Sequence, residues 1–295
     1  MALAGVALVL GGCGGQPPAD GTAVVTAAQP SVGLVPLAYD GRFRAVGMVL
    51  ENRDHGPQLC VGVIGTSDPP TCIGPDIMSW DWDAVEHNVA SGTKDGFYVL
   101  VGTFEDEIFV LTEPAVVDDG TLTGPEPFAG IDLSTPCPPP PGGWTPVDPA
   151  RTTHSAYQAA AERAESLTGF GGVWIAPIED QGIGEGPGTG GATNDPQSFV
   201  MNVSTTGDLH AMERELRALW GGSLCLSKAV RSEAELSAVQ AGLTDLPGSV
   251  GVWTDVREGQ VVVEVHVATV ETQRELDERF GAGVVRQHGL LVPTD

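Results

Sequence analysis

Short runs of mostly apolar residues, separated by polar and proline-containing turns, dominate residues 39–117 and predict β-strands. The clearest runs are 44–50, 59–64, 97–103 and 107–112. The last two flank an acidic turn at Glu105-Asp106 and predict a hairpin. Short strands at such close spacing favour a small all-β barrel or sandwich.

Residues 150–295 show a different pattern, in which strand and helix periods alternate. Asp148 followed by Pro149 predicts the start of the first helix, and Ser232-x-x-Glu235 is a capping box that starts a later one. Apolar stripes place helices at 149–168, 208–220, 232–243 and 270–280. Strands are expected at 172–176, 199–203, 224–226, 250–256, 261–267 and 284–292.

These patterns give the chain an α+β fold with two domains. The first is similar to an OB-like barrel in its number of strands. The order of elements in the second contains that of a ferredoxin-like α+β sandwich, with helices on one face of an antiparallel sheet. The expected organisation is a signal at 1–13, a flexible tether at 14–38, the barrel at 39–117, a proline-rich linker at 118–149 and the α+β domain at 150–295.

The N-terminus carries the most specific motif of the chain. Residues 2–10 form an apolar run that is far shorter than the roughly 20 residues a membrane-spanning helix needs. Leu10-Gly11-Gly12-Cys13 follows directly and resembles the lipobox of bacterial lipoproteins, of the kind found in high-GC Gram-positive species. The resemblance implies that Cys13 carries diacylglycerol and becomes the mature N-terminus, on the outer face of the cytoplasmic membrane. No Lys or Arg precedes the run, and a buried N-terminal strand is the alternative.

The charge of the chain excludes one large class of partners. A formal net charge of −25, from 39 acidic and 14 basic side chains, argues against nucleic acid, which is bound mainly through lysine and arginine. Anionic lipid head groups are disfavoured for the same reason. We therefore expect membrane contact through the N-terminal lipid alone.

Four cysteines remain when Cys13 is assigned to the lipid, and an oxidising compartment would pair them. Of the three possible connectivities we favour Cys60–Cys72, within the barrel, and Cys137–Cys225, which would join the linker to the α+β domain. The chain-entropy model assigns these bonds about 3 and about 4.6 kcal/mol. Zinc is disfavoured because the sequence contains no CxxC, HxxxH or HExxH spacing.

Few residues suggest chemistry. The glycine-rich loop at 182–191 lacks the lysine of a phosphate-binding loop and is expected to be a surface loop. Asp81 and Asp83 could offer oxygens to calcium, but the EF-hand spacing is absent and a solvated acidic turn is the favoured interpretation. Trp80 and Trp82 beside them fit either a sugar-stacking platform or the core, and we favour the core.

Glu264 and His266 project from the same face of a predicted strand, opposite its valines. An acid next to an imidazole could form a general base. No nucleophile motif such as Gly-x-Ser-x-Gly accompanies them, which favours an exposed or helix-covered sheet face. Residues 251–291 are also similar, in hairpin, helix and strand order, to the pro-domains of secreted bacterial serine proteases. That resemblance implies a protease-binding or foldase-like surface.

Taken together, these observations predict a lipid-anchored lipoprotein that acts as a non-enzymatic binding or scaffolding module of the cell envelope. No cofactor or metal is expected, and the partner would be another envelope protein. A modulator or inhibitor of a secreted protease is the main alternative. An envelope hydrolase is the third hypothesis, and it requires Glu264, His266 or the pair Asp81 and Asp83 to line a common cleft.

Overall fold

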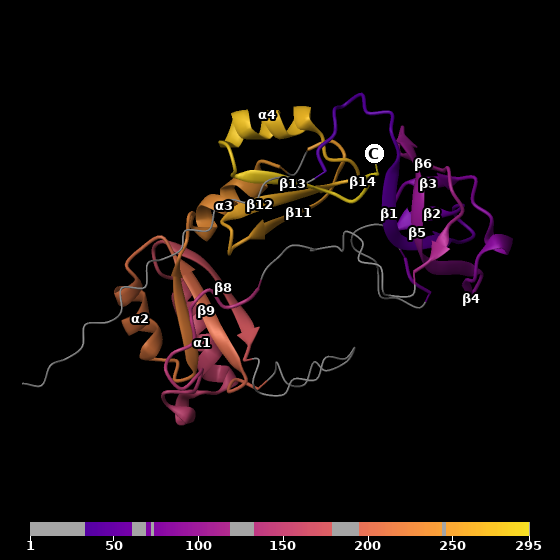
Figure 1. The fold of residues 1–295 in the computed structure, drawn as a ribbon. Helices are drawn as coiled ribbons and strands as arrows, with labels where there is room; N and C mark the ends of the chain where they lie inside the picture. Colours follow the sequence, from indigo (N-terminus) through magenta and orange to yellow (C-terminus); the bar gives the residue numbers. More distant parts are fainter. Residues whose placement is uncertain are drawn as a thin grey trace, which may run out of the picture.

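The computed structural model describes residues 33–60, 69–71, 74–118, 133–178, 195–243 and 246–294. The predicted signal with Cys13, most of the tether and the glycine-rich loop at 182–191 lie outside the described residues. The described part is a mixed α+β structure with one large sheet and two sheets of three strands each (Figure 1). None of its helices has both the length and the apolar character needed to cross a bilayer.

Five strands of the large sheet form a closed barrel. They are β1 (Phe43–Glu51), β2 (Gln58–Cys60), β3 (Asp76–Met78), β5 (Thr93–Glu105) and β6 (Ile108–Leu111). Their order is β1-β2-β3-β6-β5, and β5 closes the ring by pairing with β1 along the whole length of β1. β3 and β6 are parallel, whereas the other neighbours in the ring are antiparallel. The predicted all-β barrel is therefore present.

Three short strands extend the barrel. They are β4 (Asn88–Ala90), β7 (Val116–Val117) and β14 (Val292–Pro293). β4 and β7 pair with β5, and a 3₁₀ turn at Trp82–Ala84 precedes β4. β14 comes from the C-terminus of the chain and pairs with the start of β1.

Alternation along the strands places one set of side chains inside the barrel. The interior is fully apolar at its centre and contains Phe43, Ala45, Val49, Leu59, Ile77, Trp82, Tyr98, Leu100 and Phe109. Burying each of the larger side chains contributes about 1.5 to 3 kcal/mol. The expected hairpin is β5 and β6, and its two-residue turn consists of Asp106 and Glu107, with φ values of 51° and 60°. Positive φ at both positions is typical of a type I′ turn.

The next part of the chain forms a first α-β-β-α-β unit, which we call the first unit. Its elements are α1 (His154–Glu165), β8 (Phe170–Pro177), β9 (Phe199–Thr205), α2 (Leu209–Arg217) and β10 (Ser223–Lys228). The sheet order is β10-β9-β8, with β9 antiparallel to β8 and parallel to β10. Phe199, Met201, Leu216 and Trp220 are buried between this sheet and the helices.

The start of the first helix differs from the prediction. Asp148 caps only a 3₁₀ turn at Pro149–Arg151. Thr153 then adopts an extended conformation, with φ −128°, and its side chain accepts a hydrogen bond from the amide of Ala156. A second N-cap therefore begins α1, because a threonine at this position satisfies a free amide of the first turn.

The second unit repeats the same order of elements. It consists of α3 (Glu233–Ala241), β11 (Ser249–Asp255), β12 (Gln260–Val265), α4 (Val270–Phe280) and β13 (Val285–Gly289). The sheet order is β11-β12-β13, with β12 antiparallel to β11 and parallel to β13. Ser232 and Glu235 form the predicted capping box at the start of α3. Figure 1 shows α4 lying along one side of this sheet.

The two units share local detail as well as topology. Gly-Val-Trp occurs in the first strand of each, at residues 172–174 and 251–253. A register irregularity precedes the motif in both strands, between Phe170 and Gly172 and between Ser249 and Gly251. The repeated order, motif and irregularity indicate that the two units are versions of one structural motif.

The sheets differ from the single antiparallel sheet of a ferredoxin-like sandwich. The strands are divided between two sheets, and each sheet contains a parallel pair. The reason is the helix that connects the second and third strands of each unit, since a helical crossover returns the chain parallel to the strand it left. The last predicted strand, 284–292, is also divided, into β13 in the second unit and β14 on the barrel.

Residues that precede the barrel contact the second unit. Val35 forms a parallel bridge with Thr269. Its amide donates to the carbonyl oxygen of Ala268 at 3.1 Å, and its own carbonyl accepts from the amide of Val270 at 2.9 Å. The barrel and the second unit are therefore joined twice: the segment before the barrel contacts the second unit through this bridge, and β14, which follows the second unit, pairs with β1 of the barrel.

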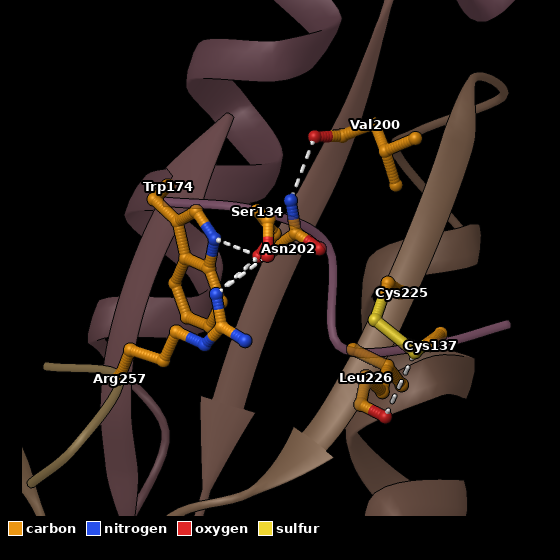
Figure 2. The surroundings of a disulfide bond; sticks show 8 residues. All are labelled: Ser134, Cys137, Trp174, Val200, Asn202, Cys225, Leu226 and Arg257. Carbon is orange, nitrogen blue, oxygen red and sulfur yellow. Dashed lines mark hydrogen bonds between the residues drawn. A yellow bond between two sulfur atoms is a disulfide. The ribbon is translucent and has the colours of Figure 1, made fainter. Parts of the chain in front are cut away.

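The linker crosses the first unit and is bonded to it. Cys137 and Cys225 form a disulfide, with their Cα atoms 5.8 Å apart (Figure 2). The carbonyl oxygen of Ser134 accepts hydrogen bonds from the indole of Trp174, at 3.3 Å, and from the guanidinium of Arg257, at 3.2 Å. The linker therefore contacts both units. Cys60 is also disulfide-bonded, and its expected partner Cys72 lies outside the described residues.

Candidate functional site

A cavity lies between the barrel and the second unit. It has a volume of about 850 Å³ and is open to solvent. Three parts of the chain line it: residues 35–41 together with Phe43, the turn end of the β5–β6 hairpin, and the part of the second unit around the start of α4. We call it the junction pocket. Its size falls within the roughly 300 to 1,000 Å³ of small-ligand sites.

The β5–β6 hairpin brings three consecutive acidic residues to the pocket, Glu105, Asp106 and Glu107. Asp106 and Glu107 adopt the left-handed conformation, which costs roughly 1 kcal/mol or more for a residue with a side chain. Glycine would avoid this cost and is the residue that the backbone conformation favours. The turn nevertheless has acidic side chains at both positions. The turn thereby presents carboxylates to the pocket.

Glu107 contacts the second unit through His266. The Nδ1 atom of His266 lies 2.9 Å from Oε2 of Glu107, and this contact is an ion pair only when the imidazole is protonated. The imidazole is 11% exposed and packs edge to face against Phe104, with ring centroids 5.5 Å apart. Burial lowers the pKa of His266 more than the nearby Glu107 raises it. The surroundings of His266 therefore favour its uncharged form.

Residues 35–41 form one wall of the pocket. The amide of Leu37 donates to Oε2 of Glu271 at 2.9 Å, which fixes the segment against α4. Tyr39 packs against Phe43 with ring centroids 5.1 Å apart. Asp40 follows directly and supplies a fourth carboxylate to the lining.

The side of the pocket formed by the second unit is polar and internally bonded. Gln287 is 1% exposed. Its side-chain amide donates to the carbonyl oxygen of Thr269 at 2.8 Å, and its side-chain oxygen accepts from the amide of Thr269 at 3.1 Å. The hydroxyl of Thr269 lies 2.9 Å from that of Thr272. These bonds hold the start of α4 in place, so this wall is fixed before any ligand enters.

The structure separates Glu264 from His266. Glu264 is 4% exposed, opposite Gly251 and His288 in register, and burial raises its pKa. His266 lies beyond the end of β12 and lines the junction pocket, whereas Glu264 does not. Of the two expected surroundings, an exposed face is therefore wrong for Glu264, which is buried on the sheet face opposite the valines.

Asp81 and Asp83 lie in the barrel, away from that pocket. Asp81 caps the 3₁₀ turn and accepts a hydrogen bond from the amide of Asp83 at 3.0 Å. Asp81 lines a smaller hollow of about 320 Å³ with Trp80 and Glu113. Throughout the described ranges, no three His, Cys, Asp or Glu side chains are grouped closely enough to hold a metal ion.

Trp82 belongs to the barrel core, as favoured from the sequence. It is 7% exposed, and its indole nitrogen donates to Oε2 of Glu51 at 2.8 Å. Trp80 packs against it with ring centroids 5.1 Å apart. The two rings meet edge to face, at an interplanar angle of 75°, and do not form a flat platform.

The sequence analysis identified His266 but missed Glu107, Tyr39 and Asp40 as site residues. The signal that could have indicated Glu107 is the run of three acidic residues in a tight hairpin turn, where glycine or asparagine is usual. Tyr39 and Asp40 carry no local signal, because their place in the site depends on the contact of residues 35–41 with the second unit.

Comparison with known proteins identified no relative of this chain. No protein-family model matches the chain, and no curated protein matches its sequence. The functional argument therefore depends on the site itself, an acidic and aromatic pocket that the barrel and the second unit build together.

Proposed function

We propose that this protein is a lipid-anchored binding protein of the cell envelope, which holds a small ligand in the junction pocket without transforming it. The observation that carries the proposal is the pocket itself. Residues 35–41 with Phe43, the β5–β6 hairpin and the second unit each contribute one wall. Pockets of this kind, partly preformed and lined by aromatic and polar groups, are typical ligand sites.

The strand order of the barrel supports this interpretation. A five-stranded ring whose third and fifth strands are parallel is the order of OB barrels, and β3 and β6 occupy those positions here. We therefore propose that the barrel is OB-like. In OB barrels the loop between the fourth and fifth strands takes part in ligand binding. The equivalent loop in this chain is the Asp106–Glu107 turn at the junction pocket.

The arrangement around His266 favours binding over catalysis. Glu107 is its acidic neighbour, but the hydroxyl of Thr269 in the same pocket contacts Thr272 and not the imidazole. A nucleophilic mechanism needs the hydroxyl and the base within hydrogen-bond reach of each other. The hydrolase hypothesis also required the predicted candidates to share one cleft, and only His266 lines this pocket.

The lipid anchor and the cellular address complete the proposal. They rest on the lipobox-like Leu10-Gly11-Gly12-Cys13. Mass spectrometry of the native protein should find a mature N-terminus at a diacylglycerol-modified Cys13. A Cys13→Ser variant should leave the membrane fraction. An unmodified native protein that is water-soluble would refute the anchor.

Binding is tested by a thermal-shift screen of small amines, acids, sugars and nucleosides against the whole chain with Cys13 replaced by serine. A hit should raise the melting temperature in proportion to the logarithm of its concentration. Thr103 lines the pocket, so a Thr103→Trp variant should fill it and abolish the shift. If no compound shifts the parent, or if the variant responds equally, the pocket is not a ligand site.

A protease modulator remains the second candidate. The hairpin, helix and strand on which the pro-domain resemblance rests correspond to β11, β12, α4 and β13. Incubation with a panel of secreted bacterial serine proteases should then reduce their activity in proportion to the amount of protein added. Unchanged protease activity would exclude this function.

A further inference from the structure

The junction pocket carries negative charge that its own side chains do not balance. Its described lining contains four carboxylates, from Asp40, Glu105, Asp106 and Glu107, and no lysine or arginine. His266 is the one basic group among them, and its burial favours the neutral imidazole. These four carboxylates are exposed in the lining, and like charges gathered around one opening attract cations.

The carboxylates are too dispersed to act together on a metal ion. No group of three acidic, histidine or cysteine side chains in the described ranges is compact enough for that. One compact ion therefore cannot meet all of them. An organic cation can place its charged group beside one or two of these carboxylates, while the rest of the molecule occupies the space between the walls.

Aromatic and apolar surfaces line the remainder of the pocket. Tyr39 and Phe43 form one edge-to-face pair, and Phe104 and His266 form another. Leu37 and Val267 lie beside these rings in the lining. Aromatic faces attract organic cations, and the apolar body attached to such a cation can pack against the same rings.

We infer that the junction pocket takes a small organic cation, an ammonium or guanidinium group joined to an apolar or aromatic body. The inference rests on the binding function proposed above and specifies its ligand class. Glu107 is the principal counter-charge. Its left-handed backbone conformation and its contact with the second unit hold the carboxylate at the pocket wall before the ligand arrives.

Three matched probes separate charge from shape: phenethylammonium, phenethyl alcohol and phenylacetate. Isothermal titration calorimetry is carried out at pH 7.5 and low salt, with the whole chain carrying Cys13→Ser. The ammonium should bind at least about tenfold more tightly than the alcohol, and phenylacetate should bind most weakly. Raising the salt concentration should weaken the binding of the ammonium and leave that of the alcohol unchanged.

Two variants assign the charge to the hairpin. Glu107→Gln and Asp106→Asn should each weaken binding of phenethylammonium by about fivefold and leave binding of phenethyl alcohol unchanged. Glu275→Gln is the matched control, because Glu275 is an exposed residue of α4 that does not line the pocket. It removes the same charge elsewhere and should have no effect. Circular dichroism of each variant verifies the fold.

The outcomes distinguish the inference from the function on which it rests. If none of the probes binds and the thermal-shift screen also finds no ligand, the binding function fails. If phenethyl alcohol or phenylacetate binds as tightly as phenethylammonium, the proposed binding function is retained and the inference that the ligand is a cation is refuted. Equal affinity of the ammonium for the parent, Glu107→Gln and Asp106→Asn would also overturn it, since the cation would then bind elsewhere.

Discussion

Replacing Cys137 and Cys225 together with alanine should destabilise the first unit strongly. The bond joins residues 88 positions apart, so it closes a loop that contains α1, β8, β9 and α2. The chain-entropy model assigns a loop of this length about 4.6 kcal/mol. Cys225 is 1% exposed and packs with Ile178 and Val200. Loss of its sulfur from this packed site adds about 1 kcal/mol.

Urea unfolding at pH 7.5 measures the effect. Tryptophan fluorescence and far-UV circular dichroism both follow the whole chain, because Trp82 lies in the barrel and Trp253 in the second unit. The double variant should lose about 5.5 kcal/mol of unfolding free energy. The parent in excess reductant also loses the disulfide of Cys60, so its loss should be at least about 4.6 kcal/mol. Cys13→Ser serves as the control and should unfold like the parent.

Two results would refute this reasoning. If the double variant unfolds at the same urea concentration as the parent, the bond does not constrain the unfolded chain as the model assumes. If the variant is destabilised but the reduced parent is not, packing of the sulfur atoms and not the cross-link supplies the stability.

The remaining predictions concern the barrel, the second unit and one buried carboxyl. Leu59→Ala should lower the unfolding free energy by about 2 to 5 kcal/mol in urea titrations, because Leu59 is fully buried in the barrel; a loss below 1 kcal/mol would contradict the barrel core. Ser232→Ala removes the capping box and should cost about 1 kcal/mol, whereas the control Ala234→Ser, at an exposed position of the same helix, is expected to change little in the same titration. The pKa of Glu264 is raised in the folded protein, so its ionisation destabilises the fold as pH rises from the ordinary carboxyl range through the raised pKa. Glu264→Gln should therefore increase stability at neutral pH and flatten the pH profile of the melting temperature in that window, and a profile parallel to that of the parent would be evidence against a raised pKa.

Local chemistry made several elements predictable. The capping box at Ser232 and Glu235 starts α3 because a side chain satisfies free amides within the same turn. The apolar runs at 97–103 and 107–112, with an acidic turn between them, predicted the β5–β6 hairpin, since strands joined by a two-residue turn pair with each other. Each of these features depends on residues a few positions apart, which is the range over which a sequence pattern carries structural information.

Non-local contacts were not predictable in the same way. Periodicity indicates which face of a strand is buried but not which strand lies beside it. For that reason the pattern gave no sign that β14 pairs with β1 or that the α+β part contains two sheets. The contact between Glu107 and His266 could not be predicted either, because the two residues belong to elements that meet only in the folded chain.

The sequence by itself determined most of the elements, some of their caps and the barrel's apolar interior, because propensity, periodicity and capping act within a turn or a strand. Tertiary structure decided which strands close the barrel, how the α+β elements divide into two similar units, and where the junction pocket forms. The physical reason is that a pocket depends on surfaces from distant parts of the chain. Tyr39, Glu107 and His266 become one site only when β14 and the Val35 bridge bring the barrel against the second unit.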